Sequence, residues 1–176
     1  MCYPMPVFII ATYNDDGTPN AMNAAWGGIS EEDEISICIS AEHKTTENIL
    51  NSGAFTVSVA TVDYVKECDY LGIVSGNDVE DKLTVCGLHT EKSEFVNAPI
   101  IKELPMALEC ELKSYDADSY RLVGRIVNVG CDESALTDGK IDPLKLRPIT
   151  YDPIGHGYYA LGDKVGKAFS DGRKIK

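Results

Sequence analysis

Lys44 is the first positive charge of the chain and stands between His43 and Thr45. The first 43 residues contain no Lys or Arg but seven Asp or Glu residues. We expect Lys44 to follow a buried strand and to begin a short helix, where free N–H groups and a partial positive charge accumulate. An ammonium group at such a helix start, with the hydroxyls of Thr45 and Thr46, would form a phosphate site. An ordinary surface lysine beside a helix cap explains these residues equally well.

The segment from Asn20 to Trp26 is the second candidate for chemistry. It combines small residues, two amides and the only tryptophan of the chain. Small side chains let a flat ligand approach the backbone, whose N–H and C=O groups can then bind it. An edge strand that carries a core tryptophan is the commoner explanation of such a segment.

Other catalytic motifs do not occur. The chain has no G-x-G-x-x-G, no G-x-x-x-x-G-K-[ST] and no G-x-S-x-G. Its carboxylate runs, Asp15-Asp16 and residues 31–34, are typical of solvated turns rather than of a paired acid and base. The three histidines are isolated in the sequence, so we predict no metal site.

The six cysteines include no C-x-x-C pair. The first residues carry no basic segment, so we expect no signal peptide, no disulfide framework and a cytoplasmic location. Cys38 and Cys110 lie in alternating apolar runs, and we expect both to be buried as small hydrophobic residues.

Composition restricts the class of protein. A chain of 176 residues suggests a single domain, residues 1–176, and 44% apolar with 25% charged residues is ordinary for a folded protein. The net charge of −12 argues against nucleic acid or an anionic membrane as partner. No apolar run approaches the roughly 18 residues of a spanning helix.

Strand patterns dominate the chain. We predict six strands, over residues 6–13, 19–26, 35–40, 55–60, 106–115 and 120–129, the last of them buried on both faces. A tight turn over residues 14–17 joins the first two, and Gly27-Gly28 ends the second.

Three short helices are expected between the strands. The first follows Lys44, with Thr45 or Thr46 as its N-cap and Gly53 as its end, and the others cover residues 63–71 and 79–86. Residues 87–104 and those after Pro143 read as irregular. Six strands with inserted helices favour an antiparallel barrel.

A resemblance covers nearly the whole chain. Its motifs are Asn20-Ala-Met-Asn-Ala-Ala-Trp26, Ile37-Cys-Ile-Ser40, His43-Lys44-Thr45 with Asn48-Ile49, Asp69-Tyr-Leu-Gly-Ile-Val-Ser-Gly76 with Asp81-Lys82, Ala98-Pro-Ile-Ile101, Leu108-Glu-Cys110, and Tyr159-Ala-Leu-Gly162 with Val165-Gly166. No single motif is diagnostic, but the ordered set resembles the flavin reductase-like family of FMN-binding split-barrel proteins, which includes flavoredoxin.

The resemblance implies a mainly β, six-stranded antiparallel Greek-key split barrel with short inserted helices. It also implies a homodimer that holds FMN near the subunit interface. The strand from Asn20 to Trp26 would lie along the flavin, and an aromatic residue, Tyr158 or Tyr159, would lie near its ring. The predicted cofactor-binding residues are Asn20, Met22, Asn23, Ala24, Ala25, Trp26, Ser40, His43, Lys44, Thr45, Lys82 and Tyr158, with Ser40, His43, Lys44 and Thr45 around the phosphate.

Two functions fit this resemblance. The first is an NAD(P)H-dependent flavin reductase or related oxidoreductase, in which FMN performs the redox step and no side chain is catalytic. The alternative is a flavoredoxin-like electron carrier that is reduced by a protein partner. A pyridoxamine-phosphate-oxidase-like enzyme would need a further basic cluster, whereas Arg121, Arg125 and Arg147 are scattered. A structural barrel without a ligand would be colourless.

Overall fold

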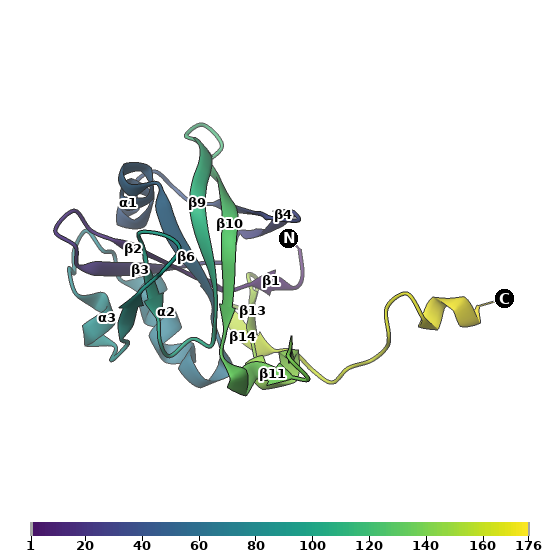
Figure 1. Cartoon of the computed structure of the whole chain (residues 1–176). Helices are drawn as coiled ribbons and strands as arrows, with labels where there is room; N and C mark the ends of the chain where they lie inside the picture. Colours follow the sequence, from purple (N-terminus) through teal and green to yellow (C-terminus); the bar gives the residue numbers. More distant parts are fainter. Residues whose placement is uncertain (1, 176) are drawn as a thin grey trace.

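One curled antiparallel sheet of seven strands forms the body of the protein (Figure 1). This computed structural model describes residues 2–175. The strand order is β3-β2-β6-β9-β10-β5-β4, and every neighbouring pair is antiparallel. The strands are β2 (Phe8–Tyr13), β3 (Pro19–Ala24), β4 (Gly27–Glu31), β5 (Glu34–Cys38), β6 (Ala54–Val59), β9 (Met106–Asp116) and β10 (Arg121–Cys131).

The sheet curls because its two edge strands are consecutive in the chain. β3 lies at one edge and β4 at the other, and only Ala25 and Trp26 connect them. Three residue steps span at most about 11 Å, so the ends of these two edge strands lie close together. The prediction of a mainly β, antiparallel split barrel is therefore confirmed. The strand count is higher than predicted, because Gly27-Gly28 begins β4 instead of ending the strand region.

Alternation along β2 builds the core on both faces of the sheet. Ile9 and Ala11 point to one side, where they pack with Cys68 and Leu71 from a helix. Phe8 and Ile10 point to the other side, into a cluster around Phe55 inside the barrel. β2 is consequently buried on both faces. The prediction that β10 is buried on both faces is wrong. Its Leu122 and Gly124 are buried, but most of its other residues are at least partly exposed.

Four short helices lie beside the sheet: α1 (Lys44–Ser52), α2 (Val65–Ile73), α3 (Lys82–Val85) and α4 (Pro143–Leu146). α1 begins at Lys44 and stops at Gly53, whose φ of 70° is left-handed, as predicted. The predicted N-cap is wrong, because His43 holds that position without a side-chain hydrogen bond. The Thr45 and Thr46 side chains are buried and bond elsewhere.

Two regions predicted to be irregular contain further strands. Within residues 87–104, β7 (Thr90–Lys92) pairs with β8 (Pro99–Ile101). After Pro143, β13 (Ile149–Asp152) pairs with β14 (Gly157–Ala160) and with β1 (Met5–Pro6) in a second small sheet. Isolated runs of three or four residues carry little periodicity, so their sequences do not reveal them. β11 (Leu136–Thr137), β12 (Lys140–Ile141) and the 3-10 turns η1 (Val62–Tyr64), η2 (Glu133–Ala135) and η3 (Asp171–Lys174) complete the fold.

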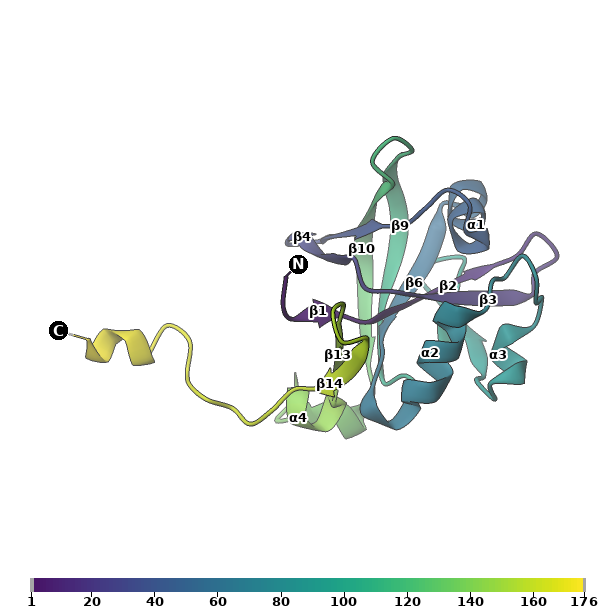
Figure 2. The ribbon, with the colours of Figure 1, turned by 180° about the vertical axis from the view of Figure 1, so that it is seen from behind.

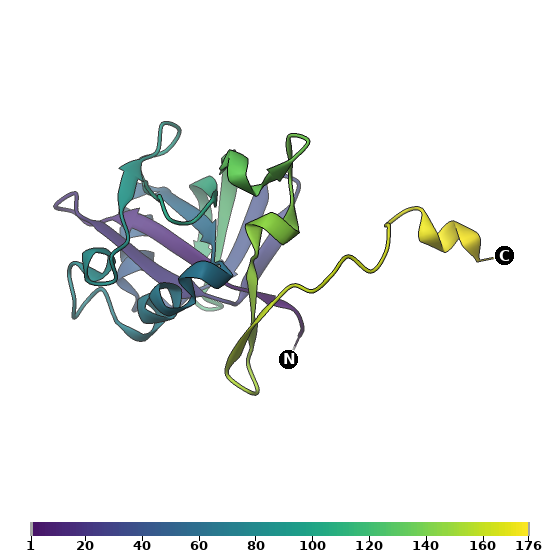
Figure 3. The ribbon, with the colours of Figure 1, turned by 90° about the horizontal axis from the view of Figure 1, so that it is seen from below.

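Residues 161–175 leave the body after β14 (Figures 1 and 2). The view from below shows the same projection (Figure 3). Across residues 2–175, none of the helices is long and apolar enough to span a membrane.

Candidate functional site

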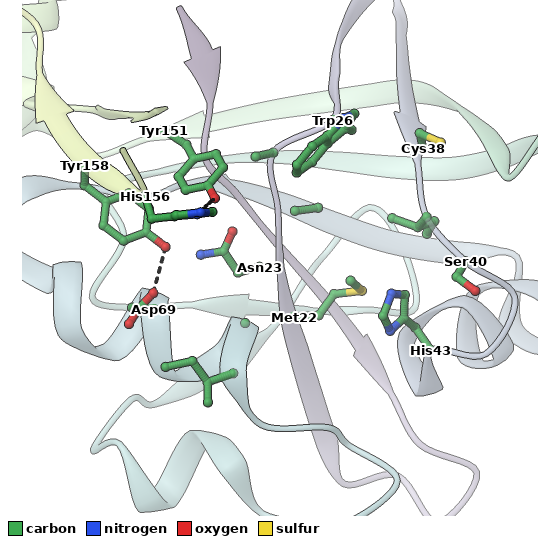
Figure 4. Close-up of a pocket in the computed structure, with 15 residues that line it drawn as sticks. Met22, Asn23, Trp26, Cys38, Ser40, His43, Asp69, Tyr151, His156 and Tyr158 are labelled. Carbon is green, nitrogen blue, oxygen red and sulfur yellow. Dashed lines mark hydrogen bonds between the residues drawn. The ribbon is translucent and has the colours of Figure 1, made fainter. Parts of the chain in front are cut away.

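A cavity of about 470 Å³ opens between β3, the end of β5, α2 and the β13–β14 hairpin (Figure 4). This volume is within the roughly 300–1,000 Å³ of small-molecule sites. The cavity adjoins a second one of about 270 Å³, because Met22, Asn23 and His43 line both. Together they place three distant parts of the sequence around one space.

Eleven of the twelve predicted cofactor-binding residues line these cavities. The larger cavity is lined by Met22, Asn23, Ala24, Ala25, Trp26, Ser40, His43 and Tyr158, and the smaller adds Lys44, Thr45 and Lys82. Asn20 lies behind the wall, where it is buried and its amide donates to Thr45 Oγ1 at 2.9 Å. It therefore supports the helix start instead of facing the cavity.

β3 forms the floor of the larger cavity. As an edge strand it pairs with β2 on one side only, so alternate N–H and C=O groups on its other side have no strand partner. Ala24 and Ala25 keep this backbone approachable. α2 comes close to the floor, because a Cβ added to Gly72 would lie 3.1 Å from the Asn23 Cβ. Asn23 ties the two elements together by donating to the carbonyl of Cys68 at 3.0 Å.

The start of α1 faces the smaller cavity. His43 caps the helix without a side-chain hydrogen bond, which leaves first-turn N–H groups available to a ligand. Lys44 pairs with Glu47 at 3.1 Å, and 22% of its side chain is exposed. The positive end of the helix dipole and the Lys44 ammonium thus act at the same place.

Lys82 lines the smaller cavity from the opposite side and is almost completely buried. Its ammonium donates to the carbonyl of Val74 at 2.9 Å and, more weakly, to that of Leu71 at 3.4 Å. Burial lowers the pKa of Lys82 to about 8. An ammonium has three protons, so one remains for a ligand while two hold the end of α2.

Aromatic residues form the far wall and mouth of the larger cavity (Figure 4). The Tyr158 hydroxyl donates to Asp69 Oδ1 at 2.8 Å, and the Tyr151 hydroxyl lies 3.0 Å from His156 Nδ1. Burial, and then the bond to the Asp69 carboxylate, raise the pKa of Tyr158. Trp26 is 58% exposed and lies near Tyr151 with ring centroids 6.3 Å apart, so it belongs to the mouth and not to the core.

Sequence reasoning missed several lining residues: Cys38, Asp69, Gly72, Tyr151 and His156. Asp69 and Gly72 belong to a motif that carries the family resemblance, but that motif predicts no role for either residue. The expectation that Cys38 is buried is wrong, because it is exposed, whereas Cys110 is buried as expected. Within residues 2–175, no group of three His, Cys, Asp or Glu side chains is placed to hold a metal ion.

Comparison with known proteins gives consistent results. The profile of the family described as flavin reductase like domain matches residues 1–155. The structure is similar to flavoredoxin of Desulfovibrio vulgaris (Miyazaki F), with 39% identity, 98% of this chain and 94% of that chain covered, and a TM-score of 0.93. A flavoredoxin from Methanosarcina acetivorans is 29% identical over 100% of this chain and 95% of its own, with a TM-score of 0.91. An FMN-binding domain of a flavin reductase-like enzyme from Shewanella baltica OS155, at 22% identity, 92% and 88% coverage and a TM-score of 0.83, shares the fold.

Proposed function

We propose, because this chain belongs to the flavin reductase-like family of split-barrel proteins, that it binds FMN in the two adjoining cavities and transfers electrons through it. The electrons would come from a reduced nicotinamide nucleotide. Bound FMN supplies the hydride and one-electron chemistry, and the protein supplies binding and orientation.

The polarity of the smaller cavity is the observation that carries this proposal. Its lining residues include two lysines, Lys44 and Lys82, and no Asp or Glu. The chain as a whole has a net charge of −12, so an anionic ligand needs a local site that is free of Asp and Glu. A phosphate group prefers cations and helix N-terminal N–H groups, and this cavity offers both. Ser40, His43, Lys44 and Thr45 would hold the phosphate.

The larger cavity suits the flat part of the same molecule. Its floor is an edge strand with small side chains at Ala24 and Ala25, so a planar ring can reach unpaired backbone groups. Tyr158, held by Asp69, closes the far wall and keeps its proton. Trp26 and Tyr151 would shield the mouth from water. None of these residues has to act as an acid or base for the chain to bind and orient a flavin.

The absorption spectrum of the purified protein tests the proposal directly. We expect a yellow protein with one FMN per chain, identified as FMN after release by heat. Addition of NADH or NADPH without oxygen should bleach the flavin bands. A colourless protein that does not take up added FMN would contradict the proposal.

A second function, an electron carrier without nicotinamide activity, is favoured by one observation. The two solved structures reported above with 39% and 29% identity are both flavoredoxins. If this function is correct, dithionite bleaches the flavin, but neither NADH nor NADPH does so at a useful rate. The same titration therefore separates the two functions, because both require bound FMN and they differ only in the donor.

A further inference from the structure

A short turn at the mouth of the larger cavity holds a histidine in an uncommon backbone conformation. Asp152 pairs with Gly157 at the end of the β13–β14 hairpin, so residues 153–156 form its turn. His156 has a φ of 53°, in the left-handed region that non-glycine residues seldom adopt. Of the five such residues between positions 2 and 175, His156 is the one that lines the larger cavity. Backbone conformations of this kind gather at functional sites, so His156 is a candidate for a role in the chemistry.

The turn holds His156 in place through its own contacts. The Asp152 carboxylate accepts a hydrogen bond from the Ile154 N–H at 2.9 Å, and the Tyr3 hydroxyl also donates to it. Gly155 leaves room for this carboxylate, because a Cβ at Gly155 would lie 2.6 Å from Asp152 Oδ2. The backbone that leads to His156 is therefore fixed before any ligand binds, which lowers the cost of binding one.

The His156 ring is paired with the hydroxyl of Tyr151 on the preceding strand. Tyr151 Oη lies 3.0 Å from His156 Nδ1, and the ring extends from the hairpin towards the space that the other labelled residues surround (Figure 4). A protonated imidazole donates from both nitrogens, so Nδ1–H binds the Tyr151 oxygen and Nε2–H is left for a ligand. A neutral imidazole that accepts from Tyr151 also keeps its proton on Nε2. In both arrangements the bond to Tyr151 orients the ring and leaves one donor free.

The rest of the lining indicates which kind of molecule this donor can bind. Among the described residues, those that line the larger cavity include no Lys or Arg, and they include one carboxylate residue, Asp69. A negatively charged molecule is therefore disfavoured in this cavity. Trp26 and Ile73 belong to the same lining and are largely exposed. Apolar surfaces beside a single free donor suit a flat, uncharged molecule that carries a carbonyl oxygen, and a quinone is such a molecule that also accepts electrons.

We propose that His156 binds a carbonyl oxygen of a quinone through Nε2–H and donates a proton to that oxygen when the quinone is reduced. This inference rests on the proposed function, in which FMN is bound in the same cavity and becomes reduced there. The quinone gains two electrons and one proton as a hydride from reduced FMN, gains the second proton from His156, and leaves as a hydroquinone. Solvent returns the proton to His156. Histidine exchanges a proton near neutral pH and is suited to this step, and Tyr151 acts only as a positioning residue.

Binding of a quinone to the oxidised, FMN-loaded chain is the first test. The probe is duroquinone, whose fully substituted ring does not add to exposed thiols such as Cys38. In equilibrium dialysis we expect His156→Asn to raise the dissociation constant of duroquinone about 3- to 10-fold, because a hydrogen bond is lost. Asparagine tolerates the left-handed conformation, so the turn should keep its shape. His89→Asn is the matched control, because His89 is exposed and lines neither cavity.

Reoxidation of the dithionite-reduced protein is the second test. Duroquinone should reoxidise His156→Asn about 100-fold more slowly than it reoxidises the wild type or His89→Asn, because a proton donor is missing. Ferricyanide takes single electrons and needs no proton, so it should reoxidise all three proteins at the same rate. The absorption spectrum of each protein verifies that its FMN content is unchanged.

The outcomes separate this inference from the proposed function. A colourless chain that takes up no FMN overturns both. If the chain binds FMN but the wild type binds no duroquinone, the quinone site alone is overturned. It is also overturned if His156→Asn binds duroquinone as tightly as His89→Asn does, or is reoxidised by it as fast. Equal slowing with ferricyanide would show that the substitution disturbs the flavin itself, and this would overturn the role of His156 as proton donor.

Discussion

Replacement of Lys44 by alanine tests whether this side chain binds the phosphate group of FMN. The ammonium is the only group of the Lys44 side chain that can bind an anion, and Lys44 lies at the start of α1 and lines the smaller cavity. Alanine removes the charge but keeps a good helix former at the first helical position. We expect FMN to bind more weakly while the barrel remains folded.

The magnitude follows from the surroundings of Lys44. A hydrogen bond to a charged group contributes about 1.5–3 kcal/mol, so its loss should raise the dissociation constant of FMN roughly 10- to 150-fold. Stability should change much less. The Lys44–Glu47 pair is separated by three residues on a helix, and half of the Glu47 side chain is exposed. Such pairs contribute only about 0.2–0.5 kcal/mol.

Fluorescence titration of the flavin-free protein provides the assay, with FMN and riboflavin as parallel ligands. Riboflavin lacks the phosphate, so its affinity should be the same in the wild type and in Lys44→Ala. Lys66→Ala is the matched control, because Lys66 is the second residue of α2, is exposed and lines neither cavity. It removes one positive charge near a helix start and should leave both affinities unchanged.

Two results would refute the reasoning. If FMN and riboflavin lose affinity equally, Lys44 contacts another part of the ligand or supports the fold. If Lys44→Ala binds FMN as tightly as Lys66→Ala does, the phosphate does not lie at the start of α1. Urea unfolding of the same proteins excludes a loss of structure as the cause.

Two further predictions concern the fold. Gly124→Ala should lower the free energy of unfolding, measured with urea, by about 1–3 kcal/mol, because the added Cβ would collide with the buried ring of Phe55. Gly130→Ala in the same strand is the control, because its Cβ would meet open space and should not lower the stability. Equal effects of the two substitutions would contradict this description of the core. Lys82→Met should change the pH dependence of stability. The wild type should gain up to roughly 3 kcal/mol as pH rises from about 8 to 10.5, because the folded chain releases the Lys82 proton near 8 and the unfolded chain keeps it until 10.5. The variant should lack this gain, and parallel stability–pH curves would contradict the pKa assignment.

Most strands of the barrel could be predicted from local patterns. The alternation over residues 35–40 and 55–60 appears as β5 and β6, and the turn ending at Gly17 joins β2 to β3 with a left-handed φ of 83°. These features depend on neighbours in the chain, which the sequence contains. The pairing of β1 with β13 could not be predicted, because it joins Met5 to Tyr151, which lies about 145 positions further along the chain.

The residue types that could hold a phosphate and a flat ring, and their order along the chain, can be identified without a structure. Tertiary structure decided which of them share a cavity. Asp69 and Tyr158 form a hydrogen bond across 89 positions of sequence, and Lys82 lies opposite Lys44 only because α2 and α3 pack against β3. Tertiary structure also determines which of these side chains are exposed. The sequence pattern predicts Trp26 and Cys38 as core residues, but both are exposed and line the larger cavity. Periodicity reports the two faces of a strand, and only packing determines what covers each face.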